Sequence, residues 1–158
     1  MTAAGPVIWV DADACPVKAE VERVAVRHRL PVRMVCDGGL RPSPNPLITV
    51  VYVTEGLDAA DDHIAQNAGP RDVVLTNDIP LADRAIAAGA RVLRFDGEEL
   101  TTRNIAAKLA ARNAADAYRA ETAASADLRP ARGGPAFTDR DRSRFSNALE
   151  RVVREVAR

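Results

Sequence analysis

The segment Val7-Ile8-Trp9-Val10-Asp11-Ala12-Asp13-Ala14-Cys15-Pro16 says more about the fold than any other part of the sequence. Its first four residues form a continuous apolar run, which is typical of a strand buried on both faces of a parallel sheet. Pro16 then favours the start of a helix, because proline is well tolerated in a first helical turn. The segment therefore predicts a buried strand that brings Asp11 and Asp13 to its carboxyl end, followed by a helix.

The alternation of strand and helix continues toward the C-terminus. We expect further strands at residues 32–36, 47–53, 73–75 and 91–95, and helices at residues 16–28, 58–67 and 79–88. The stretch 37–46 contains two glycines and three prolines, which predicts a loop. This order indicates the α/β class, as a three-layer sandwich around a mostly parallel sheet of about five strands.

Beyond residue 100 the pattern becomes helical. Thr101 is expected to cap a long alanine-rich helix that runs to about residue 124, and a loop rich in glycine and proline follows at residues 130–135. Thr138 and Asp141 resemble a capping box at the start of a last helix. The apolar stripe predicted for that helix consists of Phe145, Ala148, Leu149, Val152, Val153 and Val156. We expect one domain over residues 1–158, with an α/β body at about 1–100 and a helical part at about 101–158.

Composition excludes several classes of protein. The 158 residues suffice to bury a core without disulfides, and because aromatic residues make up only 4%, that core is expected to be aliphatic. The sequence lacks an apolar run near the length of a membrane span, and its first residues do not resemble a secretory signal. Two cysteines are too few for a disulfide framework and lack the spacing of a zinc site. These features predict a cytoplasmic protein without a membrane partner; they leave its oligomeric state open.

Charge is unevenly distributed along the chain, although the net charge is zero. Residues 1–128 hold 14 basic and 18 acidic groups, whereas residues 129–158 hold 8 basic and 4 acidic groups. A basic C-terminal part beside an acidic body suits a surface that holds a polyanion next to a metal site. The alternative is a solvated helix whose charges form ion pairs.

Acidic residues follow several of the predicted strands. Asp11 and Asp13 follow the first strand, and Asp78 follows the fourth, in Leu75-Thr76-Asn77-Asp78. Asp58, Asp61 and Asp62 share one face at the start of a helix. In open parallel sheets the functional crevice lies outside the carboxyl ends of the strands. Three separate segments are therefore predicted to direct carboxylates to one edge of the sheet.

Such a cluster needs neutralisation. Two like charges about 4 Å apart repel by roughly 4 kcal/mol at an effective dielectric constant near 20. Protons or a cation must offset this repulsion, and ligands that are all oxygen favour Mg²⁺ or Mn²⁺ over zinc. The predicted metal ligands are Asp11, Asp13, Asp61, Asp62 and Asp78, of which Asp11 and Asp78 are also the predicted catalytic residues.

Structural explanations exist for most of these residues. Asp58 and Asp78 could each cap the helix that follows, and Asp13 could be a turn residue. Asp11 is harder to explain without a function, because an unpaired charge at the end of a buried strand is costly. Cys15 invites a role as nucleophile, but the position six residues later is Val21 rather than the arginine of a cysteine phosphatase loop.

Basic residues near the predicted site are candidates for substrate binding. Lys18 follows the turn that contains Asp13, and Arg140, Arg142 and Arg144 begin the last helix. Each could meet a phosphate of the substrate. Alternatively, Lys18 is a solvated helix lysine and the arginines form surface ion pairs.

At the level of whole motifs, Ile8-Trp9-Val10-Asp11-Ala12-Asp13-Ala14-Cys15-Pro16 closely resembles the opening motif of the YaiI/YqxD family of uncharacterised bacterial proteins. Three further segments match that family in the same order: Gly56-Leu57-Asp58-Ala59-Ala60-Asp61, Thr76-Asn77-Asp78-Ile79-Pro80-Leu81-Ala82, and Gly133-Gly134-Pro135-Ala136-Phe137 with Asp141-Arg142 and Phe145. The resemblance covers nearly the whole chain.

The family is usually placed near the PIN-like nuclease domains. The resemblance thus implies a PIN-like sheet whose acids bind Mg²⁺ or Mn²⁺ for the cleavage of RNA. By position, Asp11 matches the acid after the first strand, Asp78 the acid of a Thr-x-Asp-type motif, and Asp61 or Asp62 the helical acid. A typical PIN site has a further acid after the next strand, for which Asp96 is only a loose match.

Three functions are therefore kept open. The leading hypothesis is a metal-dependent ribonuclease or related phosphodiesterase with RNA as its partner. A second is a phosphatase of the haloacid-dehalogenase type, because Asp11-Ala12-Asp13 at a strand end fits its Asp-x-Asp motif. A third is a non-catalytic module that binds RNA or a protein partner through a structural acidic pocket.

Overall fold

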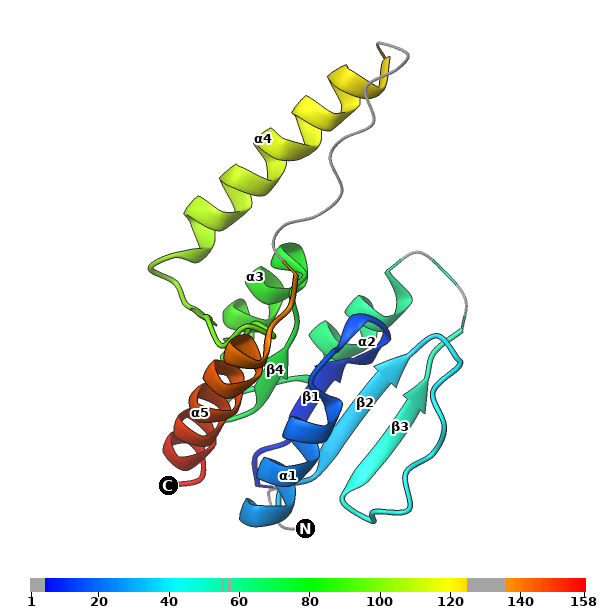
Figure 1. The fold of residues 1–158 in the computed structure, drawn as a ribbon, viewed down its shortest axis with the longest axis vertical. Coiled ribbons are helices and arrows are strands. Elements are labelled where there is room, and N and C mark those ends of the chain that lie inside the picture. Colours follow the sequence, from blue (N-terminus) through cyan, green and yellow to red (C-terminus); the bar gives the residue numbers. More distant parts are fainter. Residues whose placement is uncertain (1–4, 55, 57, 125–135) are drawn as a thin grey trace.

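A computed structural model describes residues 5–54, 56, 58–124 and 136–158. Six strands form one sheet, in the order β3-β2-β1-β4-β5-β6, and all are parallel except β6. The strands are β1 (Ile8–Asp11), β2 (Val32–Cys36), β3 (Ile48–Tyr52), β4 (Val73–Leu75), β5 (Arg91–Leu93) and β6 (Glu99–Leu100). Figure 1 shows this sheet with its helices. The α/β class and the mostly parallel sheet are confirmed.

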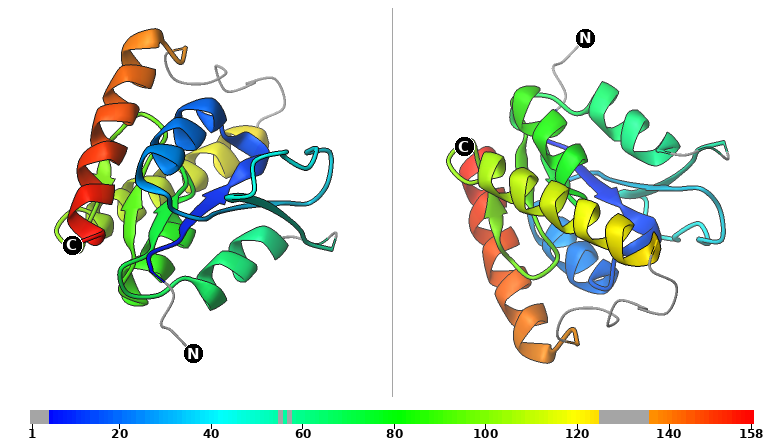
Figure 2. Two further views of the ribbon diagram at one scale, coloured as in Figure 1. Left: turned by 90° about the horizontal axis from the view of Figure 1, so that it is seen from below. Right: turned by 90° about the horizontal axis from the view of Figure 1, so that it is seen from above.

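Helices cover both faces of the sheet, which makes three layers (Figure 2). α1 (Lys18–His28) and α5 (Asp139–Val156) pack together on one face, and α2 (Ala59–Asn67) and α3 (Ile79–Ala87) pack on the other. A single turn of 3₁₀ helix, η1 (Ala12–Ala14), connects β1 to α1. The strands between the layers are almost wholly apolar, as expected for a sheet covered on both sides.

The last helix, α5, has the apolar stripe and the capping box that the sequence predicts. All six residues of the predicted stripe are buried, and the Thr138–Asp141 capping box is present with both of its hydrogen bonds. Gly97 lets this helix approach closely: at φ 93°, an added Cβ would lie 2.8 Å from the carbonyl oxygen of Arg144. The helix therefore seals one face of the sheet against β5 and its following turn.

Two details differ from the sequence prediction, and one predicted loop is not tested. β6 was not predicted; its two residues, Glu99 and Leu100, are too few to carry a periodic signal. α4 (Ile105–Ala124) begins later than predicted, because Thr101 and Asn104 form a turn in which the Asn104 side chain accepts a hydrogen bond from the Thr101 amide at 2.8 Å. The predicted loop at residues 130–135 lies outside the described residues.

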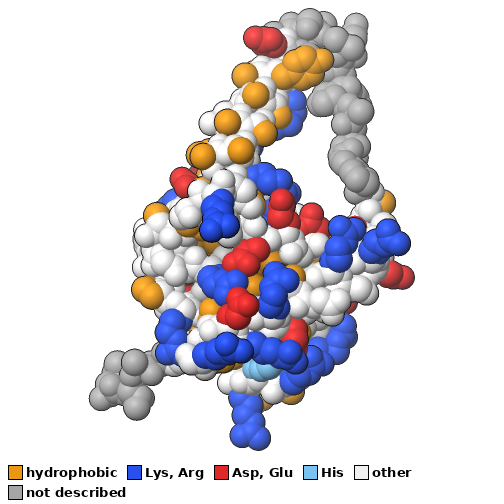
Figure 3. Space-filling model, turned by 90° about the vertical axis from the view of Figure 1, so that its left-hand side faces the viewer, with side chains coloured by type: hydrophobic (Ala, Val, Ile, Leu, Met, Phe, Trp, Pro, Cys, Tyr) orange, Lys and Arg blue, Asp and Glu red, His pale blue; other side chains and the backbone are white. Residues whose placement is uncertain are grey.

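α4 packs against α3 near its start and then extends away from the body (Figures 1 and 3). From residue 110 to residue 121 all side chains are exposed except that of Asp116, which is half-buried. Among the described residues, the structure contains no helix with the length and apolarity needed to cross a membrane.

Candidate functional site

The order of the strands creates a switch point between β1 and β4. From β1 the chain adds β2 and β3 on one side and later β4 and β5 on the other. The connections after β1 and β4 therefore leave the sheet toward opposite faces and open a crevice at the carboxyl ends of these two strands. Asp11 is the last residue of β1, and the segment 76–78 follows β4. The topology thus brings these two acidic segments together.

Asp11 is tied to the segment after β4 by a hydrogen bond. The hydroxyl of Thr76, which is fully buried, donates to Oδ2 of Asp11 at 2.9 Å. Burial raises the pKa of Asp11, the bond from Thr76 opposes that rise, and the charges of Asp78 and Asp13 add to it. Thr76 therefore fixes the orientation of a carboxylate without cancelling its charge.

Asp78 is both a helix cap and a member of this cluster. Its Oδ1 accepts a hydrogen bond from the Leu81 amide at 2.9 Å, so the capping interpretation is correct for one of its two oxygens. Its own amide donates to Oγ1 of Thr76 at 2.9 Å, which fixes the backbone beside Asp11. The cap therefore positions Asp78 at the crevice and leaves its Oδ2 for other partners.

Asp61 comes from the first turn of α2 and has the most perturbed acid–base behaviour in the cluster. Burial, the charges of Asp78, Asp11 and Asp58, and a side-chain hydrogen bond with Asp78 raise its pKa to about 7. Asp58 precedes α2 in a left-handed conformation, with φ 64°, and its side chain makes no capping hydrogen bond. The predicted capping role of Asp58 is therefore wrong.

Asp37 belongs to the same cluster, although the sequence analysis missed it. It follows β2, and its amide donates to Oδ2 of Asp13 at 3.3 Å. Burial raises the pKa of Asp13, and the charge of Asp37 raises it further. The available signal was the position of Asp37 directly after a strand, as for Asp11; the glycines and prolines that follow pointed instead to a plain loop.

These side chains line one cavity of about 270 Å³, which we call the acidic pocket. Its lining consists of Asp11, Asp13, Asp37, Asp58, Asp61 and Asp78 with Gly56, Ala59 and Ala60. Four of the five predicted metal ligands are thus brought together. Within the described part of the chain, no three Asp, Glu, His or Cys side chains are already arranged to hold a metal ion. Binding an ion would therefore require these aspartates to change rotamer.

Two acids considered from the sequence lie elsewhere. Asp62 is not part of the lining of the acidic pocket; its Oδ1 accepts a hydrogen bond from Nη1 of Arg84 at 2.7 Å, and its side chain is about half exposed. Of the pair Asp61 and Asp62, the structure thus places Asp61 at the cavity. Asp96 accepts a hydrogen bond from the Glu98 amide at 3.0 Å, as in a tight turn, and also lies outside the lining.

The basic candidates lie in α1 and α5, and none of them lines the acidic pocket. Nζ of Lys18 donates to the Cys15 carbonyl at 2.9 Å, and its charge lowers the pKa of Asp13. Arg142 donates to the Pro16 carbonyl at 2.7 Å and lies over the ring of Phe137. Arg144 pairs with Asp141 at 3.3 Å, and Arg140 is exposed. For Arg142 and Arg144, the ion-pair interpretation is therefore supported.

Cys15 and Cys36 are both buried free thiols. Burial raises the pKa of Cys15 to about 11, so that thiol is protonated at neutral pH and is a poor nucleophile. Cys36 is a small core residue, as predicted. Neither thiol is therefore a good candidate for a nucleophile at this edge of the sheet.

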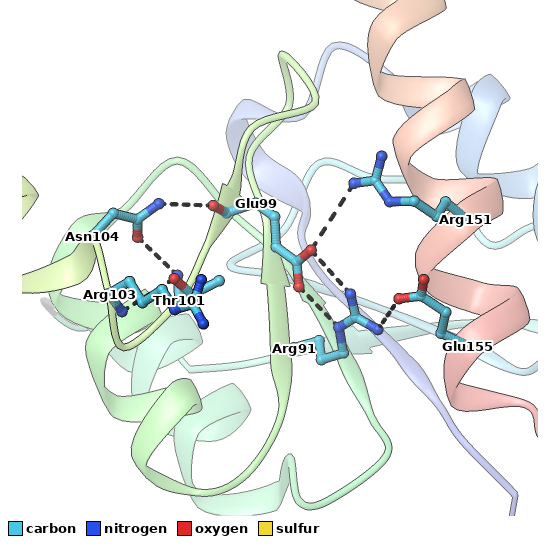
Figure 4. Close-up of polar contacts among 7 residues, drawn as sticks. All are labelled: Arg91, Glu99, Thr101, Arg103, Asn104, Arg151 and Glu155. Carbon is cyan, nitrogen blue, oxygen red and sulfur yellow. Dashed lines mark hydrogen bonds and ion pairs between the residues drawn. The ribbon is translucent and has the colours of Figure 1, made fainter.

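A second charged cluster, the Arg91 network, joins β5, β6 and α5 (Figure 4). Arg91 binds Glu99 through two hydrogen bonds, at 2.8 and 3.0 Å, and binds Glu155 at 2.6 Å. Arg151 also approaches Glu99, at 4.0 Å. The Arg91 guanidinium lowers the pKa of Glu155, and both carboxylates raise that of Arg91. In this network every acid has a cation beside it.

Comparison with known proteins identifies the family. Residues 9–155 match the family model described as "Uncharacterized BCR, YaiI/YqxD family". A UPF0178 protein of Ruegeria pomeroyi is 52% identical over 96% of both chains. UPF0178 proteins of Parvibaculum lavamentivorans and Mesorhizobium japonicum are each 48% identical over 96% of this chain, and over 95% and 94% of their own lengths. No solved structure matches the chain significantly. The protein belongs to the YaiI/YqxD family, as its motifs predicted.

Proposed function

We propose that this member of the YaiI/YqxD family is a ribonuclease that depends on Mg²⁺ or Mn²⁺ and binds the ion in the acidic pocket. The observation that carries the proposal is the convergence of carboxylates from β1, β2, β4 and the start of α2 on one cavity at the switch point of the sheet. Such a cluster is unfavourable for folding by itself, so its presence favours a bound cation. The resemblance of the motifs to PIN-like nucleases supports the same reaction class.

The residues of the pocket fit a hard divalent cation. Their donors are all carboxylate oxygens, which suit Mg²⁺ and Mn²⁺. Thr76 and the Leu81 amide each fix one carboxylate oxygen of Asp11 and Asp78, so the changes of rotamer needed to bind an ion would fall mainly on the other aspartates. Asp13, Asp61 and Asp58 would complete the ligand set. A divalent ion bound there activates water and stabilises the charge of a phosphodiester during its hydrolysis.

The chain's own groups then have distinct roles. Thr76 orients Asp11, and the cap on α3 orients Asp78. Because its pKa is raised to about 7, Asp61 is only partly ionised near neutral pH without an ion, and it would release the remaining proton when positive charge enters the pocket. Lys18, whose charge acts on Asp13, would contact a phosphate of the RNA beside the acidic pocket.

Hydrolysis of a short single-stranded RNA in the presence of Mn²⁺ tests this function. We expect cleavage that EDTA abolishes and that Asp11→Asn lowers by about 100-fold or more, the usual loss when a key electrostatic group is removed. Asp83→Asn, on the exposed side of α3, is the matched control and should cleave at the wild-type rate. Cleavage that survives Asp11→Asn unchanged would refute the proposal.

A phosphomonoester tested under the same conditions separates the phosphatase alternative. If the protein hydrolyses the monoester and leaves RNA intact, the Asp11-Ala12-Asp13 segment acts as in the haloacid-dehalogenase enzymes. If the protein binds RNA without any dependence on metal or on Asp11, it is a binding module instead.

A further inference from the structure

A second cavity adjoins the acidic pocket and contains two arginines. Its volume is about 200 Å³, and it is lined by Asp58, Asp61, Asp78, Pro80, Leu81, Arg84 and Arg112. We call it the arginine pocket. Asp58, Asp61 and Asp78 line both cavities, so the two adjoin each other, and basic side chains are part of the lining only in the arginine pocket.

The two arginines come from different helices that pack together. Arg84 lies in α3, one turn after Pro80 and Leu81, and Arg112 lies in the second turn of α4. α4 begins against α3 and then extends away from the body (Figure 1). Arg112 is therefore brought to the arginine pocket by a helix that makes few other contacts. Pro80 and Leu81 add apolar surface to the lining of the arginine pocket.

The arginines do not neutralise the acidic pocket. In the part of the chain that the structure describes, Arg84 pairs with Asp62 at 2.7 Å and Arg112 with Asp116 at 3.7 Å, and neither pairs with Asp58, Asp61 or Asp78. Asp62 and Asp116 line neither cavity. All four side chains of these ion pairs are between 42% and 52% exposed. Ion pairs this exposed contribute at most about 1 kcal/mol, so either guanidinium can change partner at small cost.

Resting on the ribonuclease function proposed above, we propose that the arginine pocket is a subsite for the RNA backbone, in which Arg84 and Arg112 bind a phosphate next to the one that is cleaved. Guanidinium groups bind phosphate oxygens through paired N–H donors, and each arginine has more donors than its ion pair uses. A strand entering the acidic pocket would then place its neighbouring phosphate between α3 and α4. The subsite positions the strand and takes no part in the hydrolysis itself.

The test measures binding of short single-stranded RNA in Ca²⁺ at several salt concentrations, by fluorescence anisotropy, with intact RNA confirmed on a gel. We expect the double variant Arg84→Gln with Arg112→Gln to bind about 10-fold more weakly, and the salt slope to fall by about 0.7 for the one phosphate that the two arginines bind. The charge-preserving variant Arg84→Lys with Arg112→Lys should retain most of the slope. In the cleavage assay, the Gln variant should raise KM and leave kcat within about threefold.

The matched control removes two arginines from elsewhere. Arg23 and Arg154 are exposed, each pairs with one glutamate, and neither lines the two cavities. Their double Gln variant should keep the wild-type affinity. An unchanged affinity and slope in the Arg84–Arg112 variant, or a loss that lysine does not restore, overturns the subsite. This result is separable from failure of the ribonuclease proposal, which shows as absent cleavage by the wild-type protein while RNA binding still depends on Arg84 and Arg112.

Discussion

The acidic pocket and the Arg91 network differ in what surrounds their carboxylates. In the Arg91 network, Glu99 and Glu155 each contact a guanidinium, which lowers the pKa of Glu155. In the acidic pocket, the carboxylates meet other carboxylates and neutral donors, and the pKa of Asp61 rises to about 7. The first arrangement holds β5, β6 and α5 together. The second opposes folding, so we attribute it to the binding of a cation.

This contrast predicts opposite effects of removing a charge from each region. Loss of a cation from the Arg91 network should destabilise the protein, whereas loss of an anion from the acidic pocket should stabilise it. A residue kept at the expense of stability is the usual mark of a functional site.

Arg91→Ala should lower the free energy of unfolding by about 2 kcal/mol, because Glu99 would lose a partner bound through two charged hydrogen bonds. The melting temperature should fall by roughly 4–8 °C. Arg151→Ala is the control, since its guanidinium lies 4.0 Å from Glu99 and its loss should cost less than about 0.5 kcal/mol. Equal melting temperatures for wild type and Arg91→Ala would show that the network does not stabilise the fold.

Asp61→Asn should raise the free energy of unfolding by about 1 kcal/mol at about pH 8 without metal, because it removes a charge repelled by Asp78, Asp11 and Asp58. The gain is small because Asp61 is only half-buried and water screens the repulsion. Denaturant unfolding of this variant and of Asp83→Asn, which should match wild type, measures the effect. A destabilised Asp61→Asn protein would mean that the pocket is a structural network after all.

The same carboxyl group predicts a dependence on pH. The pKa of Asp61 is about 7 in the folded protein against an ordinary value of 3.8, so the folded state binds its proton more tightly than the unfolded state does. Its contribution to stability is full below the unfolded pKa and is lost as the pH rises through about 7. Melting temperature measured from about pH 5 to about pH 8 without metal should therefore fall more steeply in wild type than in Asp61→Asn. Parallel curves would contradict this assignment.

Glu155→Gln should have the smallest effect on the melting temperature, well below that of Arg91→Ala, because its side chain is 45% exposed and water competes for Arg91. Chemical denaturation of this variant beside Arg91→Ala tests whether the strength of the network lies in the Arg91–Glu99 pair. A loss of stability as large as that of Arg91→Ala would show that the main contact of the network is the one between Arg91 and Glu155 of α5.

Sequence alone predicted the parts of the site that depend on local pattern. Asp11 and Asp78 were found because each follows an apolar strand whose end can be located from periodicity. Asp37 follows a strand too, but the glycine- and proline-rich segment after it indicated only a loop. Asp61 could not be separated from Asp62, because both share one helical face and only the placement of α2 against the sheet decides between them.

Features that depend on packing between distant segments were beyond prediction. The bond between Thr76 and Asp11 joins residues 65 positions apart, and the Arg91 network joins two strands to the last helix. Arg84 and Arg112 line the same cavity because α4 begins against α3. Neither residue belongs to a sequence motif that marks it. Burial and charge at these positions follow from the tertiary fold, so the local sequence carries little information about them.

Calorimetric titration of the metal-free protein with Mn²⁺ tests the main claim most directly. We predict saturable binding of one or two ions with proton release below about pH 7, as Asp61 gives up its proton, and loss of this binding in Asp11→Asn. A titration without saturable heat, or one that Asp11→Asn leaves unchanged, would contradict the account of the acidic pocket as a cation site.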